Sequence, residues 1–562
     1  MSRQKKSILK EKKAIAPIIA VVLLVVIAVI LVTIILSFGK GFAIKSLDKA
    51  GDIKDFSKSD AGNFIYPKTF SDGVLQINYN PVGAIGPVVI THYTILGSDL
   101  SPVELTTPIT LTAGQNIINL ESLYGFNSIS PEVDIQLITS DNTYIDIGGQ
   151  IDNDLVCTPG GTGTLVDPII ICDASDLNNI RNDLDANYVL GKDIDLYSFS
   201  RIDVNGWLPI NSFTGSFNGN DYVVSNLYIN RPGTDYVGLF GSINGYLSYD
   251  DEICNCSITT GATIQNLGLE NVDVIGGEFV GGFAGSVAYL IIDNIYVTGE
   301  VSGVNNVGGF SGYISFSQIS NSYSTSNISG IGGGFAGIIY GKSTAMNNDD
   351  SNITNCYATG NVDSGGGFAN FLLGGTITDS YATGSVASGD YVGGFIGNIM
   401  ELSGETGYTV IITNCYATGN VIGGEGVGGF AGFIDGTISN CYATGNATAT
   451  GDYVGGFTGV FVHMDNGAED TLSNVYSVGA ISGSGDNVGG LIGYSGGGVS
   501  NSFYDTTISG QSDNDGRGVP KITALMKNED TFTGWTFPGT WSITEGTTYP
   551  YLTSNVQSPL PQ

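Results

Sequence analysis

Cationic and catalytic side chains are scarce in this chain of 562 residues. Lys and Arg number 20 against 53 Asp and Glu, a formal charge of −33, and only 2 His are present. Nucleic acids and anionic membrane surfaces are bound by clustered Lys and Arg, so this charge argues against a nucleic-acid partner and against adhesion to membranes by charge. His92 and His463 are isolated in the sequence, so no catalytic pair or triad built on histidine is expected.

Charged residues make up only 13% of the chain, whereas hydrophobic residues reach 42% and Gly numbers 83. This hydrophobic content is ample for a core and argues against wholesale disorder. The polar surface must come from Ser, Thr and Asn, which suits an extracellular protein. The length indicates several domains.

One long apolar run lies near the N-terminus. Residues 14–38 carry no charge and as a helix would span about 37 Å, enough to cross a bilayer. Arg and Lys residues cluster before this run, so the positive-inside rule places everything after Gly39 outside the cell.

The tract KKAIAPIIAVVLL resembles the N-terminus of archaeal type IV pilins, in which a prepilin peptidase cuts before an intact hydrophobic helix. Lys13, Ala14, Ile15 and Pro17 carry the resemblance, which implies cleavage after Ala14 and other pilin subunits as partners. Ile19 stands at the fifth mature position, where bacterial pilins usually carry Glu, and this favours the archaeal version. A plain uncleaved membrane anchor remains the alternative.

Short alternating runs separated by Pro, Gly, Asn and Asp follow, and they predict a small antiparallel β-sandwich. It loosely resembles the head domain of archaeal pilins. The expected segments of this half are a basic leader (1–14), a hydrophobic pilin-like helix (15–47), a linker (48–62) and the β-sandwich domain (63–150).

Beyond residue 154 the chain is repetitive. The phrase VGGF or a variant recurs eight times between Gly281 and Leu491, and each copy is followed by a version of I(S/T)NCYATGNV. The shortest repeats are 24 to 27 residues, too short to bury a core alone, and they have no helical period. The pattern predicts a mainly β fold, a parallel β-solenoid of about nine rungs with one rung per repeat and with end caps.

The phrases VGGFAG and NCYATGNV resemble the GLUG repeat, a family of bacterial and archaeal surface proteins linked to adhesins. The resemblance implies an N-terminal cap with first rungs (155–235), the repeat solenoid (236–503) and a C-terminal cap and tail (504–562).

An aromatic residue occupies one position of every repeat, preceded by Asn or Asp two residues earlier. The Asn row predicts a hydrogen-bonded ladder between rungs. An outward aromatic row would be a stacking platform for sugar rings, whereas an inward or corner row would be a structural ladder; both interpretations remain open. The candidate glycan-contact row is Tyr296, Tyr323, Tyr357, Tyr381, Tyr416, Tyr442 and Tyr476.

The cysteines number seven. Cys356, Cys415 and Cys441 share a repeat position that holds Ser, Ile or Val elsewhere, so we expect free core thiols. Cys157 and Cys172 flank a GGTGT turn and are the candidate disulfide. Cys254 and Cys256 are compatible with either state.

Four Asn-x-Ser/Thr sequences are candidate N-glycosylation sites, with chance occurrence as the alternative. They begin at Asn255, Asn327, Asn352 and Asn446. Insertions of about ten residues interrupt four rungs at one repeat position and predict a lateral ridge, either a recognition ridge or tolerated loop decoration.

No catalytic residue, cofactor site or metal site is predicted. The acidic clusters 250–252, 349–350 and 513–515 lie in loops without regular spacing. We expect a non-enzymatic archaeal cell-surface adhesin, a pilin-like minor or tip subunit that binds cells or extracellular glycans. The alternatives are a membrane-anchored polysaccharide lyase or hydrolase and a self-associating envelope protein.

Overall fold

The computed structural model describes residues 64–71, 74–80, 88–95, 103–111, 114–119, 135–139, 144–147, 157, 159–245, 263–341, 350–401, 409–464, 470–512 and 517–562. The chain divides between Val156 and Cys157 into two compact units. Within the described ranges, no helix has the length and apolar character needed to cross a membrane. The predicted leader, hydrophobic helix and linker lie outside these ranges.

The first unit contains two antiparallel sheets, with strand orders β1-β2-β5 and β4-β3-β6-β7. The sequence predicted antiparallel strands for this part of the chain. The strands are β1 (Phe64–Ser71), β2 (Val74–Asn80), β3 (Val88–Ile95), β4 (Val103–Leu111), β5 (Gly114–Asn119), β6 (Ile135–Thr139) and β7 (Tyr144–Ile147).

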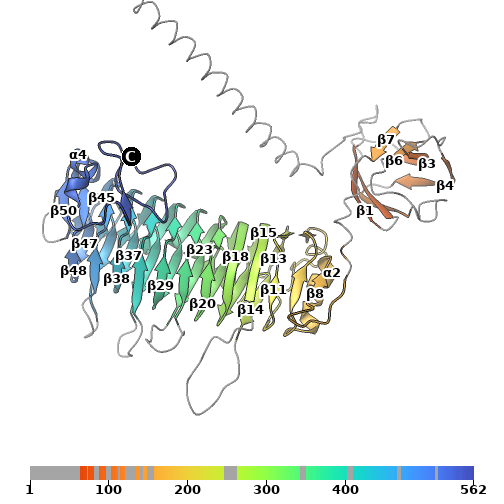
Figure 1. Ribbon diagram of the computed structural model, residues 1–562, viewed down its shortest axis with the longest axis horizontal. Coiled ribbons are helices and arrows are strands. Elements are labelled where there is room, and N and C mark those ends of the chain that lie inside the picture. The colour runs from red at the N-terminus through yellow and green to blue at the C-terminus, as the bar shows by residue number, and fades with distance from the viewer. Residues whose placement is uncertain are drawn as a thin grey trace, which may run out of the picture. The chain divides into compact units, whose positions relative to one another are not determined.

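The second unit is a stack of parallel coils, with strands of successive coils side by side in Figure 1. One face of the stack is a sheet of nine parallel strands, one from each of nine successive coils. These strands are β14 (Phe240–Asn244), β17 (Ala284–Ala288), β20 (Ser311–Ser315), β24 (Ala336–Tyr340), β28 (Ala369–Leu373), β32 (Ile396–Met400), β37 (Ala431–Ile434), β42 (Thr458–Phe461) and β47 (Ile492–Ser495).

A 34-stranded sheet forms the other sides of the coils. In the repeat region its strands are β15 (Thr263–Ile275), β16 (Glu278–Gly281), β18 (Ile291–Ser302), β19 (Asn305–Gly308), β21 (Gln318–Ser320), β22 (Tyr323–Ser324), β23 (Asn327–Gly333), β25 (Asn352–Thr354), β26 (Tyr357–Ala358), β27 (Val362–Gly366), β29 (Gly375–Thr378), β30 (Tyr381–Ala382), β31 (Val386–Gly393), β33 (Val410–Thr413), β34 (Tyr416–Ala417), β35 (Val421–Gly423), β36 (Val427–Gly428), β38 (Thr437–Ser439), β39 (Tyr442–Ala443), β40 (Ala447–Ala449), β41 (Val454–Gly455), β43 (Thr471–Ser473), β44 (Tyr476–Ser477), β45 (Ile481–Gly483), β46 (Val488–Gly489), β48 (Gly498–Ser500) and β49 (Phe503–Asp505).

The two ends of the stack have additional short elements. At the start they are β8 (Ile169–Ile171), α2 (Ala174–Asn179), η4 (Ile180–Asn182), β9 (Tyr188–Leu190), β10 (Ile194–Asp195), β11 (Phe217–Asn218), β12 (Val223–Ser225) and β13 (Tyr228–Asn230), and at the end α3 (Thr506–Ser509), β50 (Val519–Lys521), α4 (Thr523–Met526), η5 (Glu529–Thr531), β51 (Trp541–Ser542) and β52 (Tyr551–Leu552). Asp173 caps α2 by accepting a hydrogen bond from the Asp176 backbone N–H. Leu177 and Ile180 are fully buried in the solenoid core, so this helical segment caps the first coils.

The register confirms one coil per repeat. Tyr296 pairs with Tyr323, which pairs with Tyr357, so equivalent repeat positions lie directly above one another. Every strand pair in the repeat region is parallel, as a β-solenoid requires. The predicted parallel arrangement of stacked coils is therefore confirmed.

The Gly-Gly pair of each repeat is a steric requirement. A Cβ on Gly366 would lie 1.9 Å from the Ala369 carbonyl oxygen, and one on Gly367 would lie 2.1 Å from the Gly394 carbonyl oxygen of the next coil. Real Cβ atoms do not approach backbone that closely, so the backbone turns into the nine-stranded sheet only where side chains are absent.

The Phe that follows this pair forms an internal column. Ring centroids of successive Phe residues lie 4.6 to 5.0 Å apart, and every ring is fully buried. The column consists of Phe283, Phe310, Phe335, Phe368, Phe395, Phe430 and Phe457. It runs through the core of seven coils and couples each coil to the next.

The predicted Asn ladder is confirmed only in part, because the amides join adjacent rungs in three separate pairs rather than in one continuous row. The backbone adds a second reason for Asn at this position. Asn355 donates to the Asn321 Oδ1 at 2.7 Å, and Asn474 donates to the Asn440 Oδ1 at 3.2 Å. Asn414 donates in the same way to Asp379, at 3.1 Å. All of these residues have left-handed φ angles between 49° and 55°, a conformation that Asn tolerates better than most residues.

Candidate binding surface

The tyrosine row forms a continuous stack outside the solenoid core. Neighbouring rings lie 4.5 to 5.2 Å apart between centroids and are parallel to within 12°. Tyr296 ends the row, because the preceding coil has Gly268 at this position, where a Cβ would lie 2.5 Å from the Tyr296 hydroxyl oxygen. That hydroxyl donates to Glu270 Oε1 at 2.8 Å.

The stack does not offer ring faces to a sugar. Each ring between Tyr323 and Tyr442 is covered on both faces by its neighbours, so only ring edges and hydroxyl groups remain for a partner. Sugars usually stack on aromatic faces, so glycan contact by this row, through ring edges and hydroxyl groups, stays a prediction. The structural-ladder interpretation fits the geometry.

The C-terminal segment covers one end of the tyrosine row, which the sequence did not predict. Tyr416, Tyr442 and Tyr476 are at most 3% exposed, and they form a cluster separate from the solenoid core. Trp541 lies 6.0 Å from both Tyr442 and Tyr476, between ring centroids, and the Tyr476 hydroxyl donates to the Pro550 carbonyl oxygen. The predicted terminal cap therefore also runs back along the solenoid, as Figure 1 shows for the dark blue C-terminal segment.

The exposed part of the row consists of Tyr296, Tyr323, Tyr357 and Tyr381, all half-buried. Near its covered end, the Ser554 hydroxyl donates to Asp379 Oδ1 at 2.6 Å. The C-terminal segment thus reaches the coil that contains Tyr381, and the row beyond it is open to solvent.

Burial raises the pKa of every tyrosine in the row above the usual 10.0, with the Glu270 hydrogen bond adding to the effect at Tyr296. Their contribution to stability is fully present below pH 10 and is lost as the pH rises through the raised values, because the unfolded chain releases its phenolic protons first. We therefore expect the urea midpoint to fall progressively above about pH 10. Circular dichroism measures the urea midpoint, and phenolate absorbance measures the ionisation of the tyrosines. Tyr416→Phe should lessen the decrease of the midpoint above about pH 10. Ionisation of the row near pH 10 in a chain that is still folded would contradict the prediction.

The insertions leave the solenoid at one corner. They follow β14, β24, β32 and β42, and each begins where a strand of the nine-stranded sheet ends. In the other rungs this connection is one or two residues long, as at Gly374 or at Asp435 and Gly436. From β24 onward, interrupted and uninterrupted rungs alternate, as the sequence predicted.

The structure joins Cys157 and Cys172 in a disulfide, with 5.4 Å between their Cα atoms. Cys356, Cys415 and Cys441 are free and fully buried, as the repeat position predicted. Burial raises the pKa of the Cys356 thiol to about 12, so this thiol is suited to packing rather than to nucleophilic chemistry. Cys254 and Cys256 lie outside the described residues.

The structure describes three of the four candidate glycosylation residues. In two of them the side-chain amide oxygen accepts a hydrogen bond from the backbone of the next rung. Asn327 Oδ1 accepts the Asn361 N–H at 3.1 Å, and Asn446 Oδ1 accepts the Ala480 N–H at 2.8 Å. Asn352 begins β25 and is half-buried, whereas Asn255 lies outside the described residues. Lys13, Ala14, Ile15 and Pro17 also lie outside them, as do the acidic clusters 250–252 and 513–515.

Comparison with known proteins identifies the GLUG motif at residues 423–452. The chain is similar to halomucin from Haloquadratum walsbyi, at 35% identity over 150 residues, which are 26% of this chain and 1% of halomucin. It is also similar to a protein named as a Gly-rich membrane protein from Evansella cellulosilytica, at 41% identity over 101 residues, or 17% of this chain and 12% of that protein. The chain thus matches only a small part of either relative.

Proposed function

We propose that this chain is a cell-surface protein that adheres, without catalysis, to cells or extracellular glycans. The observation that carries the proposal is the single corner of a rigid solenoid from which all four insertions leave. A stack of coils fixes the spacing of these loops, so many weak contacts add along one side of the molecule. The GLUG motif and the similarity to a protein named as a membrane protein support a surface location.

The proposal places the sequence-predicted helix (15–47) in a membrane or in a pilus filament, with the prepilin peptidase and other pilin subunits as partners. The chain would then be a minor or tip subunit. Intact-mass analysis of the protein from native envelopes and sheared filaments tests this part: an N-terminus at Ile15 supports pilin processing, and an uncut N-terminus found only in membranes excludes it.

Adhesion is tested by comparing the full chain with a variant whose insertions are trimmed. Residues 246–262, 342–349, 402–408 and 465–469 are replaced by connections as short as those of the uninterrupted rungs. Beads coated with the full chain are expected to bind cells or glycan arrays, and beads with the trimmed variant to lose most of that binding while circular dichroism shows the same β content. Equal binding by both would refute the recognition role.

Two other outcomes distinguish the alternatives. Release of uronic-acid products from a glycan panel would favour a polysaccharide lyase. Binding restricted to beads that carry the same chain would favour a self-associating envelope protein.

A further inference from the structure

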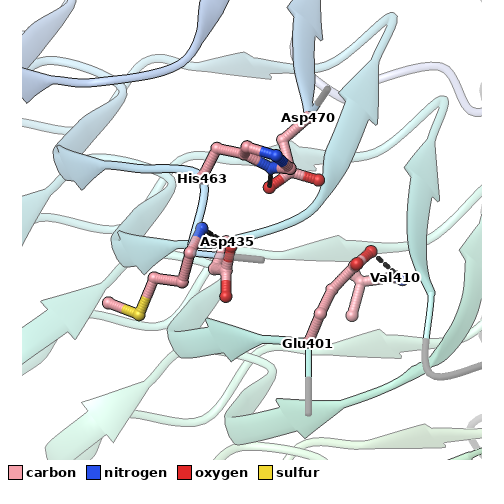
Figure 2. A network of polar contacts seen from close by, with 6 residues as sticks. Glu401, Val410, Asp435, His463 and Asp470 are labelled. Atoms are coloured by element: carbon pink, nitrogen blue, oxygen red, sulfur yellow. Dashed lines mark hydrogen bonds and ion pairs between the residues drawn. The ribbon is translucent and has the colours of Figure 1, made fainter. Parts of the chain in front are cut away.

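Two carboxylates and one imidazole meet at the insertion corner. Asp435 follows β37, whereas His463 and Asp470 flank the insertion between β42 and β43 on the next rung. One ligand atom from each residue lies within 4.8 Å of the other two. Figure 2 shows the three side chains gathered at this point, with Glu401 separate and bonded to the Val410 N–H.

The carboxylates of Asp435 and Asp470 are buried. Asp435 and Asp470 are each 3% exposed, and the His463 side chain is 22% exposed. His463 Nδ1 lies 3.0 Å from Asp470 Oδ2, and the Met464 N–H donates to Asp435 Oδ1 at 3.1 Å. Two buried carboxylates side by side repel each other, and one imidazole brings at most one positive charge.

The surrounding rungs contain no Lys or Arg of their own, and the Arg517 guanidinium, which follows them in the sequence, donates to the Gly493 carbonyl oxygen of β47. The sequence from residue 343 to residue 516 has 17 Asp and Glu but no Lys or Arg, and His463 is its single His. In a solenoid each rung packs mainly on its neighbours, and the neighbours of this cluster belong to that stretch. His463 can supply one positive charge, and residues 343–516 contain no Lys or Arg to supply a second one for the other carboxylate.

We propose that Asp435, His463 and Asp470 bind a divalent transition-metal ion of the zinc class. Zn²⁺ takes imidazole nitrogen and carboxylate oxygen together, whereas Ca²⁺ and Mg²⁺ prefer all-oxygen sites. Three protein donors leave a fourth tetrahedral position for water or for a donor from a partner. The ion would neutralise the carboxylates and link His463 and Asp470 to Asp435 of the preceding rung.

The site is distinct from the adhesive function and is tested separately. The full chain, purified without a polyhistidine tag, is dialysed against ZnCl₂ or CaCl₂, and bound metal is measured by mass spectrometry. We expect one zinc per chain and no matching calcium, with zinc lost in His463→Gln and Asp470→Asn. Asp486→Asn, which changes an exposed carboxylate of the same region, is the matched control and should retain the zinc.

A second measurement needs no variant, because the chain contains only two histidines. Diethylpyrocarbonate modifies accessible imidazoles, and peptide mass spectrometry reports each one. Zinc is expected to slow the modification of His463 several-fold and to leave His92, in the other unit, unchanged. Zinc binding that survives His463→Gln, or protection that does not distinguish the two histidines, would overturn the proposal.

Discussion

Replacing Phe368 with Ala is expected to lower the free energy of unfolding by about 3–5 kcal/mol. Its ring is fully buried and lies 4.9 Å, between centroids, from both Phe335 and Phe395. The change leaves a cavity in the middle of the internal Phe column. It also weakens two coil-to-coil interfaces at once, and solenoid stability depends on such nearest-neighbour contacts.

Urea unfolding followed by circular dichroism measures this effect. Val304→Ala is the matched control, because Val304 lies in the same solenoid but is 59% exposed, and it should change stability by less than about 0.5 kcal/mol. A loss below about 1 kcal/mol for Phe368→Ala would mean that the column does not couple the coils.

Replacing Trp541 with Ala is expected to release the C-terminal segment from the tyrosine row at a cost of about 3–5 kcal/mol. Trp541 is fully buried, and its ring centroid lies 4.3 Å from that of Trp535 and 6.0 Å from those of Tyr442 and Tyr476. Without it, the segment loses the centre of its apolar contact surface.

Tryptophan fluorescence and limited proteolysis check this result. Of the 3 Trp residues in the chain, Trp535 reports on the segment and Trp207 on the start of the solenoid. Release should shift the emission of Trp535 to the red and open the segment to proteases. Tyr442→Phe keeps the ring stack and removes a buried hydroxyl without a hydrogen-bond partner, so it should leave the segment attached. A Trp541→Ala chain as protease-resistant as the original would contradict the role.

The solenoid was predictable because the residues that determine its fold recur at regular intervals in the sequence. A recurring spacing of Gly-Gly-Phe and Asn-x-Tyr places equivalent residues in register, and the register then determines the Phe column, the Asn ladder and the tyrosine row. The orientation of a ring relative to its neighbours follows from side-chain packing, so the sequence left two interpretations of the tyrosine row open.

Contacts outside the period were not predictable. Trp541 covers tyrosines about 65 to 99 residues earlier in the chain, and no repeat links them. His463 was interpreted as isolated, because Asp435 belongs to another rung and Asp470 lies across an insertion. Aligning the rung corners, rather than the repeat phrases, would have placed Asp435 and Asp470 near the single His of the region.

The bond between Ser554 and Asp379 spans 175 residues and has a consequence for the order of folding. The coils can assemble from the N-terminal side as the chain is made, each on the one before it. The C-terminal segment has no surface to bind until the coils from Tyr381 to Phe503 exist. The C-terminal segment therefore docks last. In a stack that is unfinished or has the wrong register, the segment would stay undocked and be open to proteases.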